Sequence, residues 1–145
     1  MHPTLQTILR SLQYGILILF TSSTVAFASN NTASEPTDSP AIKIGNLVFI
    51  SGQGAGSTKT LDPTGDAIKE AFQKIRVIAK QNGGDLANVV KLTVYMADLS
   101  HDYPLLNHIV PAYFKKPYPT RSTVGVASLP KDHRIEIDAI IALKK

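Results

Sequence analysis

The alternation of apolar and polar residues first becomes regular about 40 residues into the chain. Residues 42–44 alternate, the pair Gly45-Asn46 has the composition of a tight turn, and residues 47–50 form an apolar run, which together predict a β-hairpin. We expect the hairpin to end in residues 51–56, where glycines recur. Such glycines fit either a loop close to a ligand or a plain flexible turn, and the pattern leaves both interpretations open.

The spacing then changes to that of a helix. From residue 66 to residue 81 the apolar positions fall three and four apart, and Asn82-Gly83-Gly84 predicts the end of this amphipathic helix. Residues 89–96 are β-branched and apolar, which indicates a strand with at least one buried face. A second helix fits residues 103–114.

Two features of the second helix stay open at this stage. Ser100 and Asp102 are both candidates for its N-cap, because either side chain can accept a hydrogen bond from the first turn. Pro111 falls late in the helix, where a proline lacks the amide hydrogen that the helix needs. The helix is therefore expected either to kink or to break at Pro111.

Residues 121–127 and 133–143 predict the last two strands. In the final strand Glu136 and Asp138 lie on the face opposite the apolar one, because successive side chains of a strand alternate. The apolar face is formed by Ile135, Ile137, Ala139 and Ile141. The order β-β-α-β-α-β-β predicts an α+β fold, a sheet of five to six strands with two helices on one face.

Composition and charge narrow the function classes. A chain of 145 residues has room for one ordinary domain, and its 43% apolar content is that of a globular protein. It contains no cysteine, which excludes disulfides, thiolate metal sites and cysteine nucleophiles. The net charge of +4 comes from dispersed Lys and Arg residues. Nucleic-acid binding is therefore only weakly indicated.

The first residues have the pattern of an export signal. A positive charge at Arg10, an apolar stretch at residues 16–20 and the small-x-small motif Ala26-Phe27-Ala28 predict a signal peptide of residues 1–28, cleaved after Ala28. A membrane anchor is the alternative, but polar residues interrupt the stretch well short of the ~20 residues of a spanning helix. We expect a flexible leader over residues 29–40, the domain over residues 41–145, and a periplasmic or secreted protein.

A long motif near the C-terminus resembles that of a known family. It comprises residues 121–132, RSTVGVASLPKD, and residues 135–139, IEIDA, with shorter similar stretches at residues 45–53 and 94–99. Together these stretches resemble the reactive intermediate/imine deaminase A (RidA) family, also called YjgF/YER057c/UK114. The resemblance spans most of the chain from about residue 42 onward.

The resemblance implies a chorismate-mutase-like protomer that assembles as a homotrimer, with ligand clefts between neighbouring subunits. It also implies hydrolytic deamination of reactive 2-imino acids to 2-keto acids and ammonia, as in 2-iminobutanoate/2-iminopropanoate deaminases. No metal or organic cofactor is implied, and the expected partner is a small 2-imino or 2-keto acid.

Arg121 and Glu136 are the residues that suit this chemistry. A guanidinium can hold a substrate carboxylate through two parallel charge-assisted bonds, and a carboxylate can direct a water and shuttle its protons. The resemblance further implies that Thr123, Tyr95 and Gly52 bind the substrate. For Tyr95, packing in the core is the competing interpretation.

Other functions remain open from the sequence. By spacing alone, Arg121 and Glu136 could form an ordinary salt bridge or lie in solvent. The protein could also be a non-catalytic periplasmic trimer that binds small carboxylates or acts as a chaperone. RNA cleavage is a third class, disfavoured by the export signal and the dispersed charge.

Overall fold

The computed structural model describes residues 37–60 and 63–144. The predicted signal peptide and residues 29–36 of the predicted leader lie outside the described residues. The elements follow the predicted order: β1 (Ala41–Ile44), β2 (Leu47–Ala55), α1 (Thr64–Gln81), β3 (Val89–Met96), α2 (Leu99–Tyr113), β4 (Thr120–Gly125) and β5 (Ile135–Ala142), with 3-10 turns η1 (Leu86–Asn88) and η2 (Pro130–Asp132). None of the helices described is long and apolar enough to cross a membrane.

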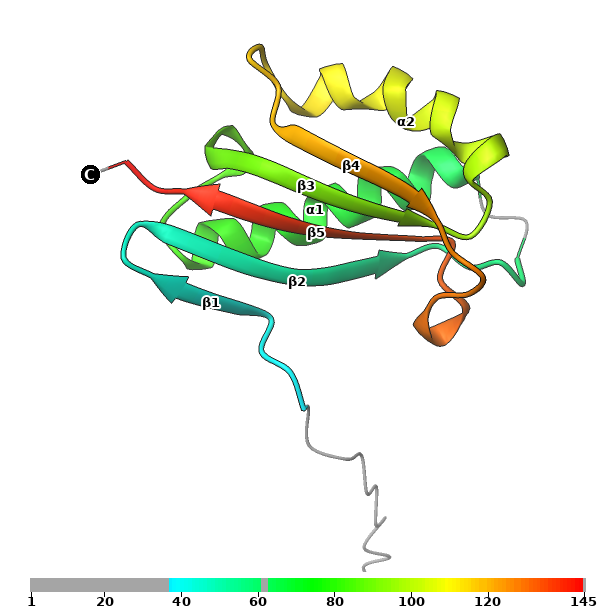
Figure 1. The fold of residues 1–145 in the computed structure, drawn as a ribbon, viewed down its shortest axis with the longest axis horizontal. Coiled ribbons are helices and arrows are strands. Elements are labelled where there is room, and N and C mark those ends of the chain that lie inside the picture. Colours follow the sequence, from blue (N-terminus) through cyan, green and yellow to red (C-terminus); the bar gives the residue numbers. More distant parts are fainter. Residues whose placement is uncertain (1–36, 61–62, 145) are drawn as a thin grey trace, which may run out of the picture. The chain divides into compact units, whose positions relative to one another are not determined.

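The five strands form one mixed sheet in the order β1-β2-β5-β3-β4. Only β3 and β4 pair in parallel, and the other neighbours are antiparallel. Helix α1 runs behind the sheet against β2 and β5, and it also contacts α2 (Figure 1). The predicted α+β fold with two helices and a five-stranded sheet is confirmed.

The core lies between the sheet and the helices. Strand β5 alternates between buried and half-buried residues, with Ile135, Ile137 and Ile141 fully buried, because these side chains face the helices. Phe72 of α1 meets Tyr113 of α2 with ring centroids 5.0 Å apart, so Tyr113 packs against the core.

The first hairpin forms as predicted, but its second strand is longer than expected. Gly45 has a φ of 61°, the left-handed conformation that the turn needs. The expectation of a loop over residues 51–56 is wrong, because β2 continues to Ala55 and pairs with β5, with a register shift between Ile50 and Gln53. The glycines here make room for side chains of β5 and of the turn before it.

Both helices begin earlier than predicted. Helix α1 starts at Thr64, and α2 starts at Leu99 with Asp98 as its N-cap, since the Asp98 carboxylate accepts from the His101 amide at 3.1 Å. Hydrogen bonds from the Ser100 hydroxyl and the His101 amide lower the pKa of Asp98, because both stabilise its charged form. Neither Ser100 nor Asp102 is the cap, and α2 continues unbroken past Pro111.

Asp102 is instead a fully buried carboxylate. It accepts hydrogen bonds from Thr64 Oγ1 at 2.9 Å and from Arg134 Nε and Nη2 at 3.1 and 3.0 Å, and it lies 2.6 Å from His101 Nδ1. A buried charge is tolerated when it is paired and fully hydrogen-bonded. This cluster joins both helices to the residue just before β5 and so fixes the start of the strand that carries Glu136.

Candidate functional site

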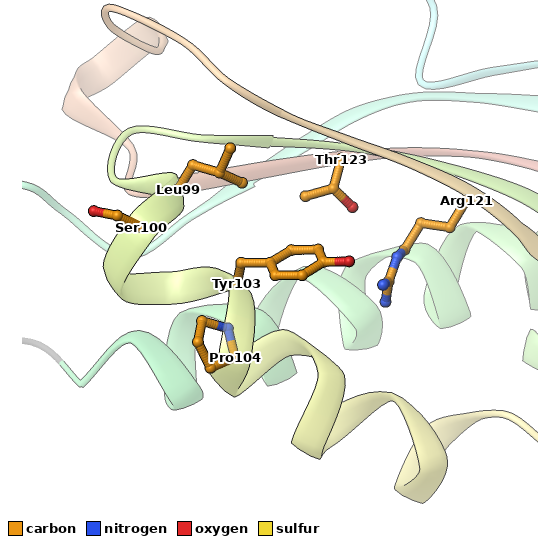
Figure 2. Close-up of a pocket in the computed structure, with 6 residues that line it drawn as sticks. All are labelled: Leu99, Ser100, Tyr103, Pro104, Arg121 and Thr123. Carbon is orange, nitrogen blue, oxygen red and sulfur yellow. The ribbon is translucent and has the colours of Figure 1, made fainter.

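A pocket of about 440 Å³ opens between β4 and α2 (Figure 2). Arg121 and Thr123 line it from β4, where they project from the same face as expected for residues two apart in a strand. The opposite wall belongs to the N-terminal part of α2: Leu99, Ser100, Tyr103 and Pro104. The pocket therefore combines one cation with apolar surface and hydroxyl groups.

Two residues of α2 hold the Arg121 guanidinium. Nη2 of Arg121 donates to Asn107 Oδ1 at 2.7 Å, and its Cζ lies 5.7 Å from the centroid of the Tyr103 ring, within cation–π range. Leu99, Tyr103 and Asn107 follow at intervals of four, so they share the helix face that is turned to β4. That spacing is the signal that could have identified Tyr103 and Asn107 from the sequence.

Thr123 brings an unpaired hydroxyl to the pocket. Its Oγ1 is buried and has no hydrogen-bond partner within the described residues. Figure 2 shows this oxygen turned toward the space between Tyr103 and Arg121. A buried hydroxyl without a partner is costly, so a ligand that pairs with it would be favoured.

Glu136, Tyr95 and Gly52 come together at a different place. Glu136 is directly opposite Tyr95 of β3 and Gly54 of β2, so the three positions form one rung across the sheet. A methyl group added to Gly52 would collide with the Glu136 carboxylate. The Glu136 carboxylate therefore packs directly over Gly52. Tyr95 lies beside Glu136 on the side of the sheet away from the core.

Arg121 and Glu136 lie on opposite faces of the sheet. Arg121 pairs with Leu92, which in turn pairs with Ala139, and both of these are buried on the helix side. Glu136 alternates with Ile135 and faces the other way. The two side chains cannot meet within one chain, which excludes the ordinary intrachain salt bridge.

The face that carries Glu136 is uncovered by the described part of the chain, and exposed apolar residues lie on it beside the polar Lys91, Thr93 and Asp138. Its exposed large hydrophobic residues are Ile42, Ile44, Leu47, Phe49 and Val124. A cavity of about 610 Å³ on this face is lined by residues that include Gly52 and Tyr95. An apolar surface of this extent is typical of a protein–protein contact.

Among residues 37–60 and 63–144, no three His, Cys, Asp or Glu side chains are grouped closely enough to hold a metal ion. Each chain presents Arg121 and Glu136 on separate surfaces.

Fold and pocket together define a small α+β protein with a chorismate-mutase-like sheet and an arginine on its edge strand β4. The model of the family described as Endoribonuclease L-PSP matches residues 29–143. The chain belongs to this family, the RidA or YjgF/YER057c/UK114 family that the C-terminal motif resembles.

Named relatives are similar over most of their length. The 2-iminobutanoate/2-iminopropanoate deaminase of Dermatophagoides farinae is 34% identical over 73% of this chain and 85% of its own. The Homo sapiens protein of the same name is 39% identical, over 70% of this chain and 77% of its own. The crystal structure of RidA from the Antarctic bacterium Psychrobacter sp. PAMC 21119 superimposes with a TM-score of 0.68 and 37% identity, covering 77% of this chain and 92% of that one.

Proposed function

We propose that this protein hydrolyses 2-imino acids to 2-keto acids and ammonia. The observation that carries the proposal is the Arg121 guanidinium, held by Asn107 on the wall of a pocket that has room for a small acid. Relatives named 2-iminobutanoate/2-iminopropanoate deaminase support the same reaction class. 2-Imino acids have a carboxylate next to the imine carbon, the atom that water attacks.

Arg121 grips the substrate carboxylate, which fixes the position of the imine carbon. Glu136 accepts a proton from a water as its oxygen attacks that carbon, and then returns the proton to the nitrogen. The carbinolamine releases ammonia when a second proton moves by the same route and the C–N electron pair leaves with nitrogen. The Thr123 hydroxyl, which has no partner within the described residues, supplies one more hydrogen bond to the bound molecule.

The complete site is formed between two copies of the chain. Arg121 and Glu136 face opposite sides of one sheet, so Arg121 of one copy has to meet Glu136 of its neighbour. The uncovered apolar face around Glu136 is the surface that a neighbouring copy would bury. A closed ring of three such copies, a homotrimer, uses the same contact three times. In that ring every Arg121 meets a Glu136 of a neighbouring copy.

The predicted export signal adds a proposal about location. The mature protein is expected to act outside the cytoplasm, after cleavage behind Ala28. N-terminal sequencing of the protein recovered from the periplasm or medium would identify the first residue. Recovery of the full-length chain from the cytosol alone would contradict this location.

The reaction is tested with a 2-imino acid produced in the cuvette by an amino-acid oxidase. We expect ammonia and the 2-keto acid to appear faster than in the spontaneous hydrolysis, at rates proportional to the protein concentration. A rate equal to the spontaneous one at every concentration would rule out the deaminase. Binding of the keto acid without turnover would favour the non-catalytic binding protein instead.

Gly52→Ala is expected to lower kcat/KM by about 100-fold, because the added methyl group displaces the Glu136 carboxylate from its position over Gly52. Steady-state kinetics with the imino acid measures the loss. Gly65→Ala is the matched control, since its methyl group would meet Ile109 and Leu105 only at 3.6 and 3.7 Å, ordinary contact distances. Unchanged kinetics in Gly52→Ala would mean that the position of Glu136 is unimportant.

A further inference from the structure

His133 lies between η2 and β5, and its imidazole occupies the place that a side chain on Gly54 would take. A methyl group on Gly54 would overlap the ring, and the nearest ring atoms are Nδ1, Cε1 and Cγ. Gly54 is the residue directly opposite Glu136. The ring therefore lies on the same uncovered face as the Glu136 carboxylate.

The two side chains fill the places of two glycines on one strand. The Glu136 carboxylate lies over Gly52 and the His133 ring over Gly54. Positions two residues apart in a strand are separated by about 6.6 Å. The acid and the imidazole therefore occupy neighbouring places on this face of β2.

The surroundings of the His133 ring favour one of its two tautomers. Nδ1 is buried and has no hydrogen-bond partner within the described residues. A hydrogen on Nδ1 would thus be a buried donor without an acceptor, whereas a bare Nδ1 leaves only a lone pair unpaired. The favoured tautomer carries its hydrogen on Nε2, at the edge of this half-buried residue that lies away from Gly54.

We propose that His133 is a further catalytic residue of the deaminase, donating Nε2–H to the oxygen that water brings to the imine carbon. This inference rests on the function proposed above and adds a donor opposite Glu136. The donor contacts the oxygen of the attacking water, then that of the carbinolamine and of the product carbonyl. A fixed donor of this kind stabilises the negative charge that develops on the carbinolamine oxygen as Glu136 removes its hydrogen, before the C–N bond breaks.

Hydrolysis of the imino acid needs no proton from His133. The water oxygen bonds to carbon, and Glu136 carries both water protons in turn to the nitrogen. The C–N bond then breaks, its electron pair leaves with ammonia, and an oxygen lone pair completes the carbonyl group. The imidazole keeps its hydrogen throughout.

Two substitutions separate this role from simple packing on Gly54. His133→Phe keeps a flat ring over Gly54 but removes the donor, and we expect kcat to fall on the order of 100-fold with KM little changed. His133→Gln restores an N–H near the position of Nε2, and we expect it to recover most of the loss. His108→Gln, on the exposed surface of α2, is the control and should match the wild type.

Equal kcat in His133→Phe and the wild type would overturn the proposal, and so would equal losses in the Phe and Gln variants when both are folded by circular dichroism. If the wild type itself shows no turnover, the deaminase proposal fails and His133 is tested by calorimetric titration with pyruvate, whose carbonyl oxygen would accept the same bond. Weaker pyruvate binding in His133→Phe, recovered in His133→Gln, supports the contact. Unchanged binding in both variants rejects it.

Discussion

Glu136→Gln should reduce kcat by about 10²–10⁴-fold, the range that a lost general acid–base costs. Glutamine keeps the size of the side chain and its place over Gly52, but its amide cannot accept and return a proton. Substrate binding through Arg121 is untouched, so KM should change little. Stopped assays of ammonia and keto-acid formation at saturating imino acid measure the difference.

Two carboxylates serve as controls for this substitution. Glu70→Gln makes the same chemical change on the exposed surface of α1, where Glu70 pairs with Lys74. Asp138→Asn makes it two residues along β5, on the same face as Glu136. Only Glu136→Gln should lose turnover. A comparable loss in Asp138→Asn would point to the general charge of this face and not to one proton carrier.

The order of helices and strands was predictable from the sequence because most of the elements have a regular apolar period. The face of Glu136 was predictable for the same reason, since Ile135 and Ile137 flank it in a strict alternation. Strand β4 offers no such alternation. Its half-buried positions are Arg121 and Thr123 themselves, so their face follows only from the pairing of β4 with β3.

The misjudged segments depend on residues far away in the chain. Gly52 and Gly54 resemble a loop because glycine has no side chain that could contribute to an apolar–polar alternation. The side chains that need their space, Glu136 and His133, come about 80 residues later. Asp102 resembles an N-cap by its local sequence, but its partner Arg134 is 32 positions away. A sequence read locally cannot assign either role.

The role of Arg121 is tested most directly by its removal. Arg121→Ala loses two charge-assisted hydrogen bonds to the substrate carboxylate, each contributing about 1.5–3 kcal/mol, so kcat/KM should fall by at least about 100-fold. Arg121→Lys keeps the positive charge without the planar guanidinium, and its kcat/KM should lie between the values of the wild type and Arg121→Ala. Arg76→Ala, a surface arginine over the ring of Tyr113, is the control. Activity in Arg121→Ala equal to that of the control would exclude Arg121 from binding.

Mixing the two inactive variants decides whether each site is shared between copies. If Arg121 of one chain works with Glu136 of its neighbour, a co-refolded 1:1 mixture of Arg121→Ala and Glu136→Gln contains sites that received both intact residues. Random assembly into a closed ring gives such sites a frequency of about one quarter, so about a quarter of the wild-type activity should return. Sites built within single chains would stay inactive at every mixing ratio. Because the sheet itself separates the two side chains, recovered activity requires that the faces of two copies meet.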